Sequence, residues 1–274
     1  MRGIDTALKK LRHDVFMEVA KVAYESEPEN INNDIEAIPY KITPDDKPKY
    51  RESIYRERAI ASERVRLAMG MSLRPEDKPV HITSGLDRSN IADKYYEPPL
   101  MQVIPSACEA CEDNVYVVTD QCRGCVAHPC ESVCPKGAIS IVNGKSVIDR
   151  NKCIKCGKCK SVCPYDAIAH KIRPCAQACG IKAIKSDAFG RAKIDDSICV
   201  GCGQCMVACP FGAIADKSQI FQLIHAIRKR DYVVAAVAPA IVGQFGPDVG
   251  LAQIKGALIE LGFREMHEVA IGAD

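Results

Sequence analysis

The sequence predicts an α+β fold in three parts: a helical and irregular N-terminal segment (1–104), a cysteine-rich domain (105–216) and an incomplete βαβ segment (217–274). Three observations lead to this prediction. Apolar residues recur at helical spacing in two N-terminal stretches. All sixteen cysteines lie between Cys108 and Cys209, and they fall into repeated runs. After the last run the chain changes to a continuous apolar stretch, which is typical of a buried parallel strand.

The first predicted helix begins near the N-terminus and ends before Pro28. Its apolar face consists of residues three or four positions apart: Ile4, Leu8, Leu11, Val15, Val19 and Val22. Residues 28–48 are rich in Pro, Asn and Asp, and this composition predicts a loop or linker.

A second helix is predicted further on, closed by Gly70. Its apolar positions are Tyr50, Ile54, Ala61, Val65 and Ala68. Arg and Glu crowd its other faces, and we expect them to be solvated i,i+4 pairs rather than a docking surface. Residues 71–104 contain several prolines and no clear periodicity, so we expect them to wrap over other elements without forming a core.

Two cysteine runs have the spacing Cys-x2-Cys-x2-Cys-x3-Cys-Pro, one beginning at Cys153 and the other at Cys199. This spacing lets three thiolates reach three corners of one cubane iron–sulfur cluster, while the last Cys serves a neighbouring cluster. The Pro that follows turns the chain away. Sixteen cysteines match four 4Fe-4S clusters with four thiolates each. The sequence therefore predicts a chain whose main role is to carry electrons.

A variant run, with two extra residues in its loop, begins at Cys122 and ends at Cys134 before a Pro. Paired with the run from Cys153 to Cys163, it predicts two clusters that exchange their last ligands. Cluster 1 has the ligands Cys122, Cys125, Cys130 and Cys163. Cluster 2 has the ligands Cys153, Cys156, Cys159 and Cys134.

The run from Cys199 also needs a partner, and only a fragment that ends in Gly180 instead of Pro precedes it. We predict that Cys108-x2-Cys111 supplies the missing first pair. Cluster 3 then has the ligands Cys199, Cys202, Cys205 and Cys179. Cluster 4 has the ligands Cys108, Cys111, Cys175 and Cys209. An alternative stays open at this point, in which Cys108 and Cys111 bind zinc with two further ligands or bind nothing.

An internal repeat runs through the cysteine-rich domain. Four segments end alike in an Ala-Ile pair: CPKGAIS (134–140), CPYDAIA (163–169), CGIKAIK (179–185) and CPFGAIA (209–215). Residues 142–153 and 189–199 lie between them and predict strand–turn–strand links. Four lysines surround cluster 2: Lys152, Lys155, Lys158 and Lys160. These lysines either raise the cluster potential, dock an acidic ferredoxin or simply point to water.

The C-terminal part predicts one βαβ unit after a helix that is marked by Ile220, Ile224 and Ile227 and ends in residues 228–230. The first strand is the apolar run 232–240, buried on both faces as in a parallel sheet. A helix over 248–261 follows, with Asp248 as N-cap and Gly262 as terminator, and the second strand is 265–271. Two parallel strands do not make a stable sheet. We therefore expect more polypeptide to follow or a partner to cover this end.

The composition excludes several other roles. A net charge of +2 gives no general affinity for nucleic acid, and no apolar run is long enough to span a membrane. The N-terminus lacks an export signal, so we expect a reducing cytoplasm and disfavour disulfides. Zinc ribbons also use cysteine pairs, but they have no use for a third Cys two residues further on.

The cysteine runs resemble those of bacterial two-cluster ferredoxins, which implies tandem ferredoxin-like 4Fe-4S units. The flanking segments VVAAVAPAIVGQFG (233–246), GALIELGF (256–263) and EVAIGAD (268–274) resemble the opening of the catalytic domain of iron-only (FeFe) hydrogenases. The basic stretch IYRERAIASERVRLAMG (54–70) is similar to the N-terminal part of the monomeric group B enzymes of that family.

This resemblance implies an anaerobic, cytoplasmic electron relay that exchanges electrons with a soluble carrier such as ferredoxin. It feeds the H-cluster, which interconverts protons and dihydrogen. The H-cluster is held by cysteines in a domain downstream, and no Cys follows Cys209 here, so no catalytic residue is carried over. The chain alone is not expected to turn over hydrogen. The alternative is a polyferredoxin-type electron-transfer subunit of another oxidoreductase complex.

Overall fold

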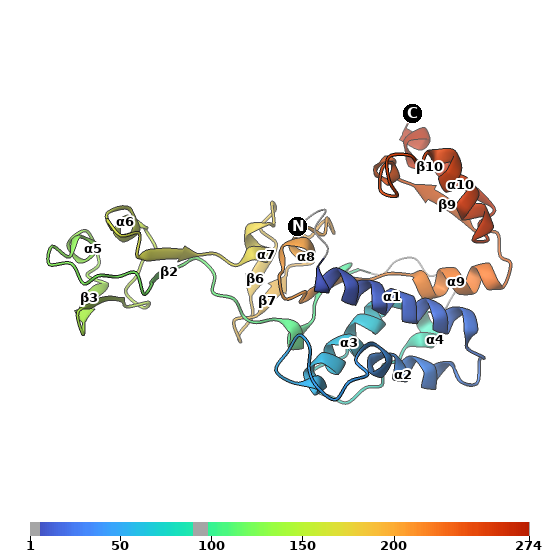
Figure 1. Ribbon diagram of the computed structural model, residues 1–274, viewed down its shortest axis with the longest axis horizontal. Helices are drawn as coiled ribbons and strands as arrows, with labels where there is room; N and C mark the ends of the chain where they lie inside the picture. The colour runs from blue at the N-terminus through green and yellow to red at the C-terminus, as the bar shows by residue number, and fades with distance from the viewer. Residues whose placement is uncertain (1–5, 90–97, 274) are drawn as a thin grey trace. The chain divides into compact units, whose positions relative to one another are not determined.

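Helix α9 (Ile220–Arg228), which follows the last cysteine run, packs against helix α1 (Ala7–Glu25) from the opposite end of the chain (Figure 1). In this computed structural model, which describes residues 6–89 and 98–273, the chain therefore divides into two compact units. One unit spans Met101–Ala215 and contains every cysteine. The other unit joins the segments that precede and follow it. No helix in the described ranges has the length and hydropathy of a bilayer-spanning segment.

The first predicted helix is confirmed as α1. Thr6 caps its N-terminus by accepting a hydrogen bond from the backbone N–H of Lys9 at 3.3 Å. Val19 and Val22 are buried, as their helical spacing predicts. Ile4, the first residue of the predicted apolar face, lies outside the described residues.

The linker predicted for residues 28–48 is wrong, because helix α2 (Ile31–Ile42) occupies most of it. Its isoleucines recur at helical spacing, and Ile35 and Ile38 are completely buried. Pro39 lies inside the helix near its end. Burial of each large apolar side chain contributes about 1.5–3 kcal/mol, which outweighs the poor helix propensity of the Asn, Asp and Pro residues.

The second predicted helix is confirmed as α3 (Ile54–Ala68), although Tyr50 lies before its start. The expected solvated charged face is wrong. Four charged side chains of α3 are at most 8% exposed: Glu57, Glu63, Arg64 and Arg66. Helical spacing identifies the apolar stripe of a helix, but it does not tell whether irregular segments cover the remaining faces.

The buried charges of α3 hold the backbone of these irregular segments. One carboxylate oxygen of Glu57 accepts hydrogen bonds from the N–H groups of residues 49–51. The guanidinium of Arg66 donates to the carbonyl oxygens of Ile82 at 2.7 Å and Ser84 at 3.0 Å. A buried charge is tolerated only with such partners, so α3 organises the segments on either side of it.

Residues 71–104 are mostly irregular, as predicted, but the expectation that they form no core is wrong in part. Ile82 joins the apolar core that α1, α2, α3 and α9 share, where Phe221 is completely buried. Residues 90–97 lie outside the described residues. The short elements here are α4 (Leu86–Ser89), β1 (Met101–Val103) and the 3-10 turn η1 (Pro105–Ala107).

The predicted βαβ unit is confirmed. Its elements are β9 (Val234–Val237), the 3-10 turn η2 (Pro239–Ile241), α10 (Leu251–Glu260), β10 (Glu265–Glu268) and the 3-10 turn η3 (Val269–Ala273). The strands pair in parallel with Val234 opposite Glu265. Gly262, with a φ of +109°, follows the end of α10 as predicted, whereas the N-cap is Gly250 and not Asp248. The prediction that β9 is buried on both faces is wrong within this chain, since Val234 is 43% exposed.

The cysteine-rich unit is built from short hairpins and single-turn helices. The strands are β2 (Val115–Val118), β3 (Ile139–Val142), β4 (Lys145–Ile148), β5 (Ile168–Lys171), β6 (Ile184–Ser186), β7 (Ala192–Ile194) and β8 (Ile214–Asp216). The helices are α5 (Pro129–Ser132), α6 (Lys158–Ser161), α7 (Pro174–Gln177) and α8 (Gln204–Ala208). The hairpins β3–β4 and β6–β7 confirm that each link contains a strand–turn–strand, but the first strand begins earlier than predicted: β3 reaches the range 142–153 only at Val142, and β6 ends before residue 189.

An antiparallel ladder of β2 with β5 divides this unit into two lobes. Lobe one, residues 115–171, contains α5, α6 and the β3–β4 hairpin. Lobe two consists of the chain before β2 and after β5, and in it β1 pairs with β8. Lobe one is therefore an insertion into lobe two, entered through β2 and left through β5.

Candidate iron–sulfur cluster sites

The four Ala-Ile segments fold into one and the same turn. In each, the sulfur of the last Cys accepts a hydrogen bond from the N–H of the Ala four residues further on. The distances are 3.3 Å from Ala138 to Cys134, 3.4 Å from Ala167 to Cys163, 3.2 Å from Ala183 to Cys179 and 3.4 Å from Ala213 to Cys209. Hydrogen bonds of this kind orient a ligand sulfur and help to set the potential of the cluster it binds.

Each turn is fixed on its other side by a neighbouring chain segment. The carbonyl of the same Ala accepts a backbone hydrogen bond at 2.7–2.8 Å, from Asp149, Thr119, Asp195 and Ile104 respectively. Each Ala is at most 2% exposed, and each following Ile at most 8%. The sequence repeat is therefore a repeat of thiolate-positioning turns, and the Ala-Ile pair is the part that anchors them.

The residue before the second Cys of each loop also has one shared conformation. It lies in the left-handed region, with φ of +45° at Ala110, +59° at Gly124, +59° at Lys155 and +66° at Gly201. Glycine adopts this region without strain, whereas Ala and Lys do so at a cost. The backbone just before the second Cys therefore has a left-handed φ in all four loops despite their different residues.

The four cysteines assigned to cluster 1 line one cavity in lobe one, which we name site 1. They are Cys122, Cys125, Cys130 and Cys163. The atom-free space is about 350 Å³, part of it open to solvent. The hydroxyl of Ser146 lies 3.2 Å from the buried sulfur of Cys130. The backbone N–H of Ser146, followed by that of Gly124, lowers the pKa of Cys122, which favours the thiolate form that binds metal.

The four cysteines assigned to cluster 4 also line one cavity, which we name site 4. They are Cys108, Cys111, Cys175 and Cys209. The atom-free space is about 330 Å³. The N–H of Ala192 donates to the sulfur of Cys108 at 3.4 Å. The pair whose assignment was open in the sequence thus lies beside the two cysteines proposed as its partners, although lobe one separates them in the chain.

Arg173 also lines site 4, although no spacing or periodicity in the sequence indicates such a place for it. Its side chain is 3% exposed. The guanidinium donates to the carbonyl oxygens of Cys111 at 2.8 Å, Gly190 at 2.7 Å and Lys185 at 3.3 Å. Within the described residues it has no carboxylate in ion-pair contact, so a buried positive charge borders this site. One feature of the sequence could have pointed to Arg173: it begins an Arg-Pro-Cys string, at the position that His128 has in the His-Pro-Cys string of site 1.

In the remaining two groups, sites 2 and 3, several of the thiols lie close enough to influence one another. In site 2, burial raises the pKa of Cys159, and the nearby thiols of Cys153 and Cys156 raise it further. Cys134 packs in the same apolar cluster as Cys159.

In site 3, burial and, to a smaller extent, the neighbouring thiols raise the pKa of Cys205 to about 11. These neighbours are Cys199, Cys179 and Cys202. The influence of these thiols on one another requires that they lie close together, as ligands of a common group must.

The chemistry of these sulfur groups suits metal clusters. All sixteen thiols are free of disulfides. Burial raises the pKa of Cys175 to about 12, so a neutral thiol is favoured there until a cationic metal draws the proton off. Among the described residues no group of three or more His, Cys, Asp or Glu is arranged to hold a single metal ion. The cysteines of sites 1 and 4 instead surround a space, and cubane clusters are held in this way by four thiolates.

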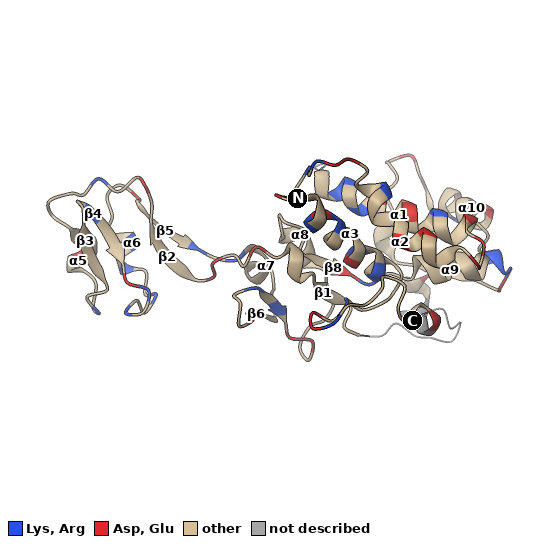
Figure 2. Ribbon diagram, turned by 90° about the horizontal axis from the view of Figure 1, so that it is seen from below, with Lys and Arg blue, Asp and Glu red and all other residues tan. Residues whose placement is uncertain are grey.

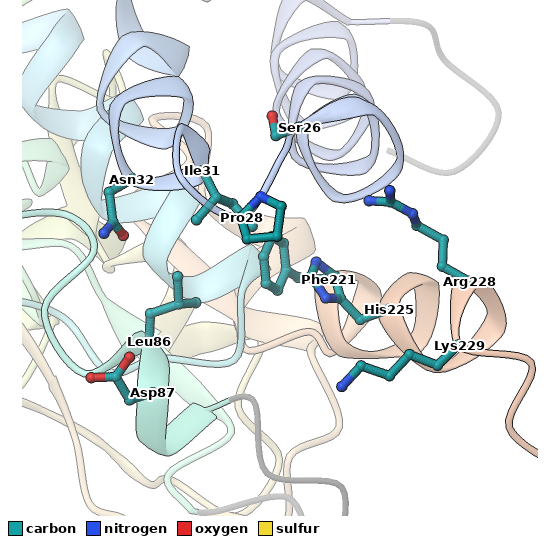
Figure 3. A pocket seen from close by; sticks show the side chains of 10 residues that line it. All are labelled: Ser26, Pro28, Ile31, Asn32, Leu86, Asp87, Phe221, His225, Arg228 and Lys229. Carbon is teal, nitrogen blue, oxygen red and sulfur yellow. The ribbon is translucent and has the colours of Figure 1, made fainter.

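The other unit contains a separate cavity with atom-free space of about 1190 Å³, including open solvent, beside the end of α9 (Figure 3). The ring of His225 packs against Phe221 with centroids 4.5 Å apart. Burial lowers the pKa of His225, and the charges of Arg228 and Lys229 lower it further. No cysteine lines this cavity, so it is distinct from the four sulfur sites.

Comparison with protein families places known domains on the cysteine-rich unit and on the βαβ unit. A 4Fe-4S dicluster domain matches residues 152–213, and a second one matches residues 191–238. The Fe-S cluster-binding domain of LdpA matches residues 126–172. The C-terminal domain of the iron-only hydrogenase large subunit matches residues 231–274.

Three curated proteins show the range of relatives. A 7Fe ferredoxin of Hydrogenibacillus schlegelii is 41% identical over 56 residues, which is 20% of this chain and 72% of that protein. An uncharacterized ferredoxin of Methanocaldococcus jannaschii is 29% identical over 118 residues, covering 32% of this chain and 78% of its own. The electron transport protein HydN of Escherichia coli is 38% identical over 71 residues, 24% of this chain. The chain spans 41% of the length of HydN.

Proposed function

This chain belongs to the ferredoxin family through its cysteine-rich unit, which transfers electrons by 4Fe-4S clusters, and from that premise we propose that it is a four-cluster relay serving a hydrogen-converting catalytic domain. The observation that carries the proposal is the fourfold thiolate-positioning turn, together with the two cavities that are each lined by four cysteines. One-electron transfer is the chemistry that each bound cluster supplies. The chain provides the sulfur ligands, the hydrogen bonds to sulfur and the charged side chains near the clusters.

We assign the ligands by site. Site 1 uses Cys122, Cys125, Cys130 and Cys163; site 2 uses Cys134, Cys153, Cys156 and Cys159; site 3 uses Cys179, Cys199, Cys202 and Cys205; site 4 uses Cys108, Cys111, Cys175 and Cys209. The cavities of sites 1 and 4 support two of these sets. Sites 1 and 2 exchange their last ligands, as do sites 3 and 4, so each pair of clusters is held within one lobe.

The link to hydrogen conversion rests on the segment after Ala215. Residues 231–274 resemble the C-terminal domain of an iron-only hydrogenase large subunit, and they fold as β9–α10–β10. The H-cluster of that family needs cysteines, and none follows Cys209 in this sequence. We therefore infer that the relay passes electrons to or from an H-cluster held elsewhere. We propose a reducing cytoplasm as its compartment, because thiols stay available as metal ligands there.

The second candidate is a polyferredoxin-type subunit of another oxidoreductase complex, exchanging electrons with a soluble carrier. It is favoured by the kind of relatives found, which are ferredoxins and an electron transport protein. The two proposals differ in what is fused or bound to β9–α10–β10. H-cluster cysteines in the same reading frame beyond Asp274 favour the first, and an unrelated domain or a stop codon there favours the second.

The relay itself is tested by counting iron and acid-labile sulfide after anaerobic purification. Four clusters predict about 16 Fe per chain. A colourless protein with stoichiometric zinc contradicts the proposal. A count of about 8 Fe would mean that only one lobe binds clusters, and a count of about 12 Fe would mean that one of the four sites binds none.

A further inference from the structure

The four lysines around site 2, which we name the lysine rim, surround its most accessible thiol. The rim consists of Lys152, Lys155, Lys158 and Lys160, all exposed. Cys156, in the middle of this loop, is exposed, and its neighbour Ile154 is 55% exposed. A partner that covers this loop therefore comes close to the cluster ligands and meets both positive charge and an apolar side chain.

The rim charges are largely uncompensated among the described residues. Of the four lysines, Lys152 alone has an ion-pair partner in those ranges, Asp149, at 3.8 Å. In the part of the chain that the structure describes, the other three lysines of the rim make no ion pair. Positive charges left unpaired around a surface attract an acidic partner and speed its encounter.

The repeat provides an internal control for what the fold itself requires. The loop of site 3 has the same ligand spacing, and Gly157 and Gly203 cap α6 and α8 with the same left-handed conformation. The positions that correspond to the rim are Ile198, Gly201, Gln204 and Met206. In Figure 2, which colours Lys and Arg blue, α6 carries such residues and α8 carries none. Cluster binding in this loop therefore does not need the lysines.

From these observations we propose that the lysine rim docks an acidic one-electron carrier protein of the ferredoxin type, and that electrons enter or leave the chain at site 2. This inference rests on the proposed relay, because it names the relay's outer end. One electron leaves the reduced carrier and enters the oxidised cluster of site 2; no bond breaks and no proton moves. Docking explains the rim better than potential tuning does, since exposed charges are screened by salt and act weakly on a cluster.

The test compares two double variants of equal charge. K158Q/K160Q removes half of the rim, and K78Q/K193Q removes two exposed lysines remote from it in sequence. The probe is an acidic plant-type ferredoxin, mixed with each purified holoprotein at low and at high salt. We expect the association rate constant to fall at least about tenfold at low salt for K158Q/K160Q, and its salt dependence to flatten. The control variant should behave like the parent chain.

A second electron donor separates docking from tuning. Reduction by methyl viologen, a small dye that needs no docking site, should proceed equally fast in all three proteins. If the reduction rate of the K158Q/K160Q variant falls by the same factor with the dye as with ferredoxin, the lysines tune the cluster potential and the docking proposal is overturned. An unchanged rate with ferredoxin, or an equal loss in the control variant, also overturns it. Iron content, measured in the same samples, reports independently on the relay.

Discussion

Replacing Arg173 by methionine should lower the reduction potential of the cluster at site 4. The side chain is buried, it borders the four cysteines of the site, and its partners are neutral carbonyl oxygens. An added electron makes the cluster more negative, so a nearby positive charge stabilises the reduced state. Methionine has a similar length and no charge. The variant therefore removes this stabilisation while it fills much of the same space.

The size of the shift follows from the distance between the charge and the cluster. Arg173 lines the cavity of site 4. For a separation on the order of 8 Å, two unit charges at an effective dielectric constant of about 20 interact by about 2 kcal/mol. A tenfold change in a one-electron equilibrium corresponds to about 59 mV or about 1.4 kcal/mol. The expected fall in potential is about 90 mV.

The assay is a redox titration followed by EPR, on the parent chain, R173M and R173K, with iron counted in each. R173K keeps the positive charge but loses the planar fork of donors, so its potential should stay within about 30 mV of the parent value. An unchanged potential in R173M, with the full iron content, would refute the electrostatic reasoning. An equal shift in R173K and R173M would show instead that Arg173 acts by holding the backbone around Cys111.

Three further predictions concern the sites and the helical unit. Cys108→Ala should reduce the iron content from about 16 to about 12 per chain, and an unchanged count contradicts the ligand set of site 4. Gly124→Ala should destabilise lobe one by about 3 kcal/mol and deplete iron, because its Cβ would lie 1.9 Å from the carbonyl oxygen of Gly144. Gly137→Ala, which has the same sign of φ but open space around it, is the matched control and should cost about 1 kcal/mol in thermal unfolding. Arg66→Met should lower the free energy of unfolding in urea by about 3 kcal/mol, because buried carbonyl groups lose their donor, whereas Lys21→Met at an exposed pair should cost less than about 1 kcal/mol.

The parts that the sequence predicted correctly are those with a strong local pattern. Cysteine spacing is set by the geometry of a cubane cluster and of the loop that binds it, so the cluster ligands can be predicted without knowledge of the rest of the fold. The hairpins and α1, α3 and α9 follow from periodicity and turn residues. The Ala-Ile repeat was visible as well, although its purpose, an N–H directed at each last sulfur, required the structure.

The predictions were wrong where tertiary packing determines which side chains are buried. Composition suggested a linker where Ile35 and Ile38 build α2, because Asn, Asp and Pro hid the apolar stripe. The charges of α3 looked solvated, yet Glu57 and Arg66 are buried against segments with no pattern of their own. Arg173 was missed for the same reason. A single cation gives no periodic signal, and its importance comes from chain segments that meet only in three dimensions.

The insertion of lobe one into lobe two has a consequence for the order of assembly on the ribosome. All ligands of sites 1 and 2 lie between Cys122 and Cys163, so they emerge together and early during translation. Site 4 must wait, since Cys108 leaves the exit tunnel first and Cys209 last among the sixteen. Until then Cys108 and Cys111 lack their two partner cysteines. The pairing of β2 with β5 brings the two ends of lobe one together, which lowers the entropic cost of bringing Cys175 back to Cys111. Iron loading should therefore proceed from the inserted lobe toward the outer one, and a nascent chain stalled before Cys175 should already bind two cubes.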